Sequence, residues 1–188
     1  MALPLEYRGV SLKSSMGLDL AAYQLDNVAA GADEGPGRSL PWYSVDLSTV
    51  LERLAGKEGR WLQTLEPRIQ FVHVPFEDQD DLPAFDTIDP DINIVQLFRR
   101  NRFVGLDRLG DTDQLSLGVT TRLLRARDGS QFLTATLGET LYFSSRDVQL
   151  DGKPPSDDNS SDYIAELGMN FNEVWNVDLG YQWDSDES

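Results

Sequence analysis

The sequence predicts an all-β fold, an antiparallel up-and-down meander of about eight long strands. Apolar and polar residues alternate along most of the chain, which is the period of strands with two different faces. The alternating segments run for roughly 9 to 14 residues, whereas strands of globular proteins average about 5 to 6. Short turns also alternate with long connections, as in barrels that have short turns at one rim and long loops at the other.

The composition excludes several classes of protein. The 188 residues are enough for one sizeable domain, and a formal net charge of -16 argues against a nucleic-acid-binding protein, which needs a basic face. The chain has no cysteine and a single histidine, His73, which argues against redox thiols, zinc sites and a Ser-His-Asp triad. Because no nucleophile–base pair is visible either, we expect no enzymatic activity, no metal and no cofactor.

Two further features bear on targeting. No stretch approaches 18 consecutive apolar residues, so no transmembrane helix is expected. The opening MALPLEYRGV lacks the charged and apolar regions of a signal peptide.

In the first half of the chain, a strand near residues 3–9 is followed by a short turn at 11–16 and a long loop at 27–41. The next strand alternates from Tyr43 to Leu51, although residues 47–54 also have a short helical period. A turn at 55–60 then leads to a strand with one apolar face, and a long loop follows at 76–106. The residues of that apolar face are Leu65, Ile69 and Phe71.

In the second half, the strand from Leu115 to Leu123 is followed by a turn at 126–131 that contains an Asp-Gly hairpin signal. A strand ending near Phe143 precedes the third long loop, at 147–162. Two strands close the chain, at 163–171 and 174–184, and a turn at 172–174 joins them. The three long connections are expected to lie at the outer rim of a barrel.

Aromatic residues gather near the predicted strand ends, where the girdles of a membrane barrel lie. They are Trp42, Tyr43, Trp61, Tyr142, Phe143, Tyr163, Phe171, Trp175 and Trp183. A soluble β-sandwich would also explain the alternation, but it explains the strand length and the loop rhythm less well. The pattern therefore favours a membrane barrel over a sandwich.

Three blocks of sequence resemble one known family. They are TLEPRIQFVHVPFEDQDDLPAFDT (64–87), LFRRNRFVGLDRLGDTDQLSLGVTTRLL (97–124) and LGETLYF (137–143). Their order and spacing resemble the barrel domain of the LPS-assembly outer-membrane protein family LptD, also called organic solvent tolerance protein or OstA. The resemblance covers the whole chain and is most specific from Trp61 to Phe143.

The resemblance implies that residues 1–188 are part of an outer-membrane β-barrel domain, a curved open segment of a large transmembrane barrel of about 26 strands. It implies a place in the Gram-negative cell outer membrane and a role in inserting lipopolysaccharide (LPS) into the outer leaflet. The implied partners are LPS, outer-membrane lipid, the plug lipoprotein LptE inside the barrel and the periplasmic Lpt bridge. The family cysteines, the signal peptide and the periplasmic jellyroll have no counterpart in this sequence.

The candidate contact residues for LPS or the plug lipoprotein fall in two groups. One is the end of the second long loop, with Arg99, Asn101, Arg102, Phe103, Gly105, Asp107 and Arg108; the other is the predicted lumen side, with Glu66, Arg68 and Arg122. The loop arginines either contact lipid A phosphates or the plug, or they hold the loop through ion pairs with Glu77–Asp81 or Asp107, and we favour the second interpretation. The lumen group either touches the plug or pairs across strands, again with the second favoured.

Three residues interrupt the strand pattern. Glu139 falls on the apolar side of its strand, and the adjacent Gly138 suggests a bulge that would turn the carboxylate inward. Pro67 and Pro75 cannot donate hydrogen bonds, so each marks an irregularity or a weakened seam.

An alternative function is a self-contained small β-barrel or a soluble β-sandwich that acts as a binding module. Closure distinguishes the two possibilities. A small barrel would pair its first strand near Leu5 with its last strand near Leu179, whereas a segment of a larger wall leaves both edges open.

Overall fold

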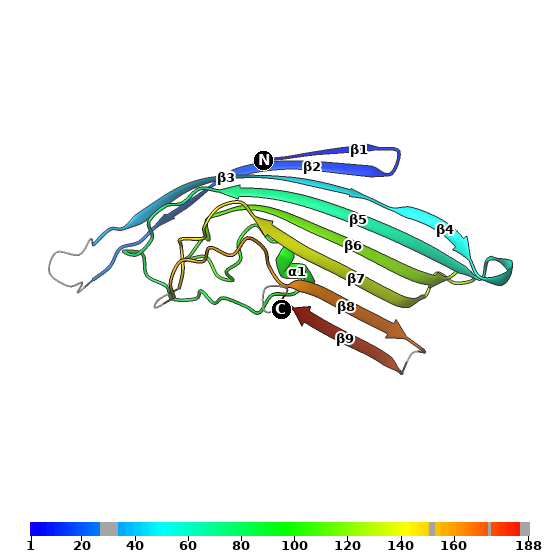
Figure 1. Cartoon of the computed structure of the whole chain (residues 1–188). Coiled ribbons are helices and arrows are strands. Elements are labelled where there is room, and N and C mark those ends of the chain that lie inside the picture. Colours follow the sequence, from blue (N-terminus) through cyan, green and yellow to red (C-terminus); the bar gives the residue numbers. More distant parts are fainter. Residues whose placement is uncertain (27–33, 151–152, 173, 185–188) are drawn as a thin grey trace.

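The computed structural model describes residues 1–26, 34–150, 153–172 and 174–184. The described residues form one antiparallel sheet and two single-turn helices (Figure 1). The strands are β1 (Ala2–Tyr7), β2 (Val10–Ala22), β3 (Gly37–Thr49), β4 (Leu51–Ala55), β5 (Trp61–Val74), β6 (Thr112–Arg125), β7 (Gln131–Tyr142), β8 (Tyr163–Asn170) and β9 (Asn176–Trp183). The helices are η1 (Lys57–Gly59) and α1 (Ile94–Leu97). The predicted all-β meander is confirmed.

The sheet is open. Its order is β1-β2-β3-β5-β6-β7-β8-β9, with β4 continuing beyond β3 along β5. Within the described residues β1 pairs only with β2 and β9 only with β8, so the strands that carry Leu5 and Leu179 are at opposite edges (Figure 1). A closed small barrel and a two-sheet sandwich are therefore both excluded for this arrangement, and the curved open segment is confirmed.

The two faces of the sheet differ in chemistry because residues alternate sides along each strand. The convex face carries exposed apolar side chains, among them Leu18 at 56% exposure, Leu47 at 40% and Leu179 at 59%. The concave face is polar along most of its length, with Asp46 and Gln70 as register partners on β3 and β5. Such a large exposed apolar face needs an apolar environment to cover it.

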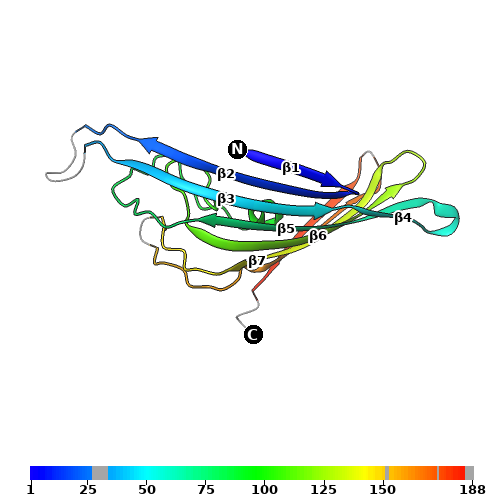
Figure 2. The same ribbon diagram turned by 90° about the horizontal axis from the view of Figure 1, so that it is seen from above.

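Aromatic contacts lie at both ends of the strands. Near the long loops, the ring of Tyr43 lies 5.8 Å from that of Phe71 and 5.0 Å from that of His73. Near the short turns, Trp61 and Phe132 are 5.2 Å apart between ring centroids. Figure 2 shows the long connections gathered at one end of the strands and the short turns at the other.

Several predicted boundaries were wrong. The predicted turn at 11–16 lies inside β2, and the turn is instead at Arg8 and Gly9, which have φ values of 50° and 81°. Residues 47–54, with their short helical period, form the end of β3 and most of β4 because their side chains continue the two-sided pattern. The first long connection runs from 23 to 36, not 27 to 41, so residues 37–41 begin β3. Residues 27–33 of that predicted loop lie outside the described residues.

The other two long connections span 75–111 and 143–162, a few residues longer than predicted. Opposite Pro67, the neighbouring strand is interrupted between Thr49 and Leu51, which agrees with the predicted irregularity. Pro75 directly follows the last residue of β5.

The predicted bulge at Gly138 was wrong. Pairing between β6 and β7 is regular from Gln114↔Tyr142 to Leu123↔Leu133, with Leu117 opposite Glu139. The register shift lies instead between Leu123 and Leu124, next to the turn. Glu139 therefore stays on the convex face, beside the apolar side chains, and Gly138 has another role.

Candidate functional site: a loop folded onto the concave face

The connection from 75 to 111, here called the inner loop, folds back against the concave face of the sheet (Figure 1). It contains α1, a single helical turn beside β7 and β8. The side chain of Asn93 caps this turn by accepting hydrogen bonds from the backbone N–H groups of Val95 and Gln96, each at 3.0 Å. The N–H of Ile94 donates to Glu166 of β8 at 3.2 Å, which fixes the start of the turn against the sheet.

Two glycines on the concave face make this close approach possible. Gly118 and Gly138 are register partners on β6 and β7. A Cβ atom at Gly118 would lie 2.7 Å from the ring of Phe98, and one at Gly138 would lie 2.8 Å from the side chains of Ile94 and Leu97. We call this pair the glycine floor. Gly138 is thus small because the inner loop packs on it, and not because the strand bulges there.

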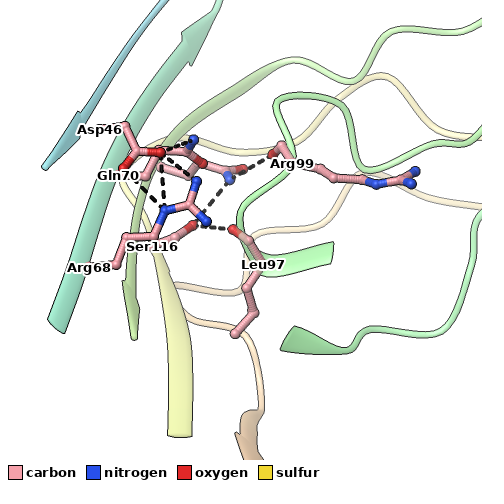
Figure 3. Close-up of polar contacts among 7 residues, drawn as sticks. Asp46, Arg68, Gln70, Leu97, Arg99 and Ser116 are labelled. Carbon is pink, nitrogen blue, oxygen red and sulfur yellow. Dashed lines mark hydrogen bonds and ion pairs between the residues drawn. The ribbon is translucent and has the colours of Figure 1, made fainter. Parts of the chain in front are cut away.

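Polar contacts hold the same part of the loop (Figure 3). The buried hydroxyl of Ser116 donates to the carbonyl oxygen of Leu97 at 2.5 Å, and the Gln114 side chain reaches the carbonyl oxygen of Arg99 at 3.5 Å. Arg68 stacks on the Phe98 ring, with its guanidinium carbon 4.2 Å from the ring centroid, and it binds Asp46 at 2.5 Å. Strand residues therefore contact the inner loop in two ways: Ser116 and Gln114 bind its backbone, and Arg68 packs on the side chain of Phe98.

Three of the four loop arginines are bound within the protein. Arg100 forms an ion pair with Asp19 of β2 and lies 4.2 Å above the ring of Trp42. Arg108 is 4% exposed and donates to the carbonyl oxygen of Gln79. Arg102 donates to the carbonyl oxygen of Val148, in the third long connection. These partners differ from the predicted carboxylates of residues 77–81. Arg102 and Arg108 bind main-chain carbonyl oxygens, and the partner of Arg100 is Asp19.

Asp107 organises a second set of contacts. Its carboxylate accepts hydrogen bonds from the backbone N–H groups of Phe85 at 2.8 Å and Asp86 at 2.9 Å, and from the hydroxyl of Tyr23 at 2.8 Å. These bonds, the one from the Asp86 backbone above all, lower the pKa of Asp107 from its ordinary value of 3.8 to about 2. The carboxylate is thus ionised, and it is bound by two backbone N–H groups of the inner loop and by the hydroxyl of Tyr23, which directly follows β2.

Arg38 at the start of β3 was missed by the sequence reasoning, which placed it in a loop. It is 6% exposed and donates to the Gln79 side chain at 2.8 Å and to the carbonyl oxygens of Leu106 and Asp107 at 3.0 and 2.8 Å. No local pattern indicates this role, because its partners are 41 to 69 residues away in the sequence.

The other predicted loop residues shape the inner loop. Asn101 donates to the carbonyl oxygen of Arg108 at 3.0 Å and accepts from the N–H of Gly110 at 2.9 Å. Phe103 is 2% exposed. Gly105 has a φ of 106°, and a Cβ there would lie 2.6 Å from the carbonyl oxygen of Asp86, so only glycine fits without strain.

The inner loop is also bonded to the third long connection. The Asp111 carboxylate accepts from the N–H groups of Asp147 and Val148, both at 2.9 Å. Arg146, on the same connection, lies 3.7 Å above the ring of Tyr142 and bonds Asp158. The two connections are therefore joined by direct hydrogen bonds.

The lumen-side candidates pair with one another as predicted for the structural interpretation. Glu66 on β5 forms an ion pair with Arg122 on β6, and Thr64 donates to Glu66 at 2.8 Å. Glu66 and Arg122, with Arg68 and Arg99, line an open hollow of about 880 Å³ beneath α1. Among the described residues, no helix has the length and the apolar content needed to cross a lipid bilayer.

A curved open wall with an apolar convex face, a polar concave face and an inward-folded loop is part of a β-barrel. Comparison with known proteins identifies the kind of barrel: the chain belongs to the LptD family, described as LPS transport system D, which matches residues 1–188.

Several curated relatives carry the name LPS-assembly protein LptD. The protein from Thiobacillus denitrificans (strain ATCC 25259 / T1) is 38% identical over 175 residues, which cover 93% of this chain and 24% of the relative. That from Nitrosococcus oceani is 38% identical over 180 residues, covering 94% and 24%. That from Hahella chejuensis (strain KCTC 2396) is 35% identical over 188 residues, covering 100% and 24%. The chain thus spans about a quarter of the length of these relatives.

Proposed function

We propose that this chain is a section of the wall of an outer-membrane translocon that inserts LPS into the outer leaflet. The observation that carries the proposal is the open two-faced sheet, together with membership of a family described as LPS transport system D. The relatives are named LPS-assembly proteins, which points to the same process. In this role the chain forms part of the wall of the passage for LPS, and no catalytic step is assigned to its residues.

In this proposal the convex face meets lipid. Its exposed apolar side chains need hydrocarbon to cover them, and the ladders between neighbouring strands satisfy the backbone N–H and C=O groups that a bilayer cannot. The aromatic pairs at both strand ends match the levels at which the rings of a membrane barrel contact the two interfaces. The long connections then lie on the outer side of the cell outer membrane.

The concave face lines the lumen. Its cross-strand ion pairs and hydroxyl groups keep the interior hydrophilic, as the passage of a sugar-bearing lipid requires. The inner loop narrows that interior. The finer assignments belong to the same proposal: residues 1–188 as part of one barrel domain, LPS as cargo, a plug lipoprotein of the LptE type within the lumen and a periplasmic Lpt bridge that supplies the cargo.

A segment exchange tests the proposal. The matching segment of the full-length LptD from Thiobacillus denitrificans would be replaced by this chain, and LPS at the cell surface would be measured in cells depleted of their own protein. We expect the chimera to restore surface LPS. A chimera that inserts stably in the outer membrane and leaves LPS inside the cell would contradict the proposal, and one that does not insert would contradict the assignment as a barrel wall.

A further inference from the structure

A hollow of about 600 Å³ lies at the short-turn end of the sheet, lined by the turn that joins β6 to β7 and the turn that joins β8 to β9 (Figure 1). We call it the turn hollow. Its lining combines two arginines, Arg125 and Arg127, with three exposed apolar side chains, those of Phe171, Val174 and Trp175. Cationic and apolar groups thus lie side by side, as they do in proteins at the headgroup level of a bilayer.

The cation at the centre of this arrangement, Arg125, belongs to the convex face. Arg125 is the register partner of Trp61, and pairing between β5 and β6 is regular from this position to the other end of the two strands. Residues two apart share a face, so Trp61 lies on the side of Leu65 and Ile69, which are exposed on the convex face. In the proposed function this is the face that meets lipid.

The guanidinium of Arg125 is held in place by several contacts. It donates to the hydroxyl of Ser130 at 3.0 Å and to the carbonyl oxygens of Phe171 at 3.3 Å and Asn170 at 3.5 Å. Its central carbon lies 5.5 Å from the centroid of the Phe132 ring. These contacts fix one cation between the β6–β7 turn and the end of β8.

Every one of these partners of Arg125 is electrically neutral. Among the residues that the structure describes, no carboxylate bonds to Arg125. Asp128, which also lines the turn hollow, is bound by Arg127 at 3.0 Å and by the hydroxyl of Ser130 at 2.5 Å. Arg125 is therefore a positioned cation whose charge is not balanced by direct contact.

Aromatic rings continue the apolar convex face to the edge of the turn hollow. The Phe132 ring lies 5.2 Å from that of Trp61 and 6.0 Å, edge-on, from that of Phe171. Beyond Phe171, the side chains of Val174 and Trp175 are 81% and 68% exposed. Apolar groups grouped in this way need a partner to cover them, and an aromatic ring beside a cation is typical of the bilayer interface.

We propose that the turn hollow binds the headgroup of an anionic phospholipid in the inner leaflet of the outer membrane; the inference rests on the proposed function, which puts the short turns at that leaflet. Arg125 contacts the phosphate, and Val174 and Trp175 cover the glycerol and the first carbons of the acyl chains. A guanidinium has five N–H donors, so the three bonds above leave at least two for phosphate oxygens.

The chemistry of the turn hollow favours this occupant over two others. A free anion would satisfy Arg125 but would leave the exposed apolar side chains in water. A zwitterionic headgroup would bring its own ammonium group close to Arg125, and like charges repel. A headgroup with a net negative charge, such as that of phosphatidylglycerol, matches both the unbalanced cation and the apolar surface.

Photocrosslinking tests the proposal in the full-length protein with its partners, reconstituted in vesicles of equal parts phosphatidylglycerol and phosphatidylcholine. A photoreactive amino acid replaces Val174, and mass spectrometry of the adducts gives the ratio of the two lipids. We expect phosphatidylglycerol to exceed phosphatidylcholine about fivefold, the factor that one basic residue contributes near an anionic membrane surface. Equal labelling by the two lipids overturns the proposal.

Variants assign the preference to the turn hollow. Arg125→Gln should return the ratio to that of the membrane, and Arg125→Lys, which keeps a charge but loses the planar fork, should retain part of the preference. Trp175→Ala leaves every contact of Arg125 in place and should lower the ratio about twofold or more. Lys57→Gln removes a cation from η1, at the same end of the strands, and should leave the ratio unchanged. A preference that survives Arg125→Gln, or that falls equally in Lys57→Gln, overturns the proposal.

The same crosslinks distinguish this inference from the proposed function. Lipid adducts at Val174 without a headgroup preference remove only the phospholipid site. The absence of lipid adducts of either kind contradicts a place of the short turns at a bilayer surface, and with it the proposed function. In cells, adducts of Val174 to a periplasmic protein in place of lipid overturn the site in favour of a protein partner.

Discussion

Replacement of Gly118 by alanine is expected to separate the inner loop from the wall. The new Cβ atom would lie 2.7 Å from one ring carbon of Phe98 and 2.9 Å from another. Ordinary van der Waals contacts between carbon atoms begin near 3.5 Å, so the ring has to move by roughly 1 Å. Phe98 also carries the stacked guanidinium of Arg68, which would have to follow or lose its contact.

The free-energy cost of Gly118→Ala can be estimated from the known effect of overpacking. Extra methylene groups in a well-packed site cost typically about 1–3 kcal/mol, which raises the population of the detached loop roughly 5- to 150-fold. The strands themselves should tolerate the change, because alanine adopts strand geometry and the backbone of Leu137, at 3.7 Å, leaves room for a methyl group. The damage is therefore confined to the loop.

Hydrogen exchange of residues 94–100 in the full-length protein measures this population directly. Gly180→Ala on β9 is the matched control, since a Cβ there has nothing within 4 Å. A second variant, Phe98→Ala, completes a double-mutant cycle. In the Phe98→Ala background, Gly118→Ala should accelerate exchange only slightly further, because the ring that clashes with the new Cβ atom is absent. Unchanged exchange in Gly118→Ala, or equal acceleration in Gly180→Ala, would refute the glycine floor.

Three further changes test other parts of the structure. Because the pKa of Asp107 is lowered to about 2, the ionised carboxylate stabilises the loop fully above pH 4, and this stabilisation is lost as the pH falls from about 4 to 2. Hydrogen exchange of residues 85–108 should therefore accelerate as the pH falls through this range. Asp107→Asn should abolish this pH dependence. Ile69→Arg on the convex face should destabilise the barrel in lipid by about 2–4 kcal/mol at midplane depth, whereas Ser48→Arg on the concave face should cost much less in the same urea titration. Arg102→Ala should leave the carbonyl oxygen of Val148 without its hydrogen-bond donor and lower the free energy of local unfolding of residues 143–150 by about 1–3 kcal/mol. Protease sensitivity of this segment measures the change, and Arg99→Ala should leave it unaltered.

The strands were predictable because the polarity of each residue in them indicates which face of the sheet its side chain is on. Ser116 and Leu117 differ in polarity for a local reason, the alternation of faces, and the same is true along β3 and β9. The turn at Arg8 and Gly9 was misplaced because the following Ser-Leu-Lys-Ser-Ser run reads as a turn but is an ordinary polar–apolar alternation.

The inner loop was less predictable, because its contacts join residues that are far apart in the sequence. Gly138 was explained by a local bulge, although the cause is the approach of Ile94 and Leu97 from a segment about forty residues earlier. The sequence singles out the loop arginines as a group, but nothing in the local sequence distinguishes Arg99 from Arg108. Arg108 is bound because the carbonyl oxygen of Gln79, 29 residues earlier in the sequence, lies beside it, and such a distant partner has no local signal.

The inner loop has a mechanical consequence for the wall that carries it. Its contacts reach Asp19 on β2, Trp42 on β3, Ser116 on β6 and Glu166 on β8, so it acts as a brace across the concave side. A brace attached at these points resists any change in the angle between the strands it spans. Among the described residues it forms no hydrogen bond or ion pair with β1 or β9. We therefore expect this wall to bend mainly at the β1–β2 and β8–β9 seams, with the strands between them moving together.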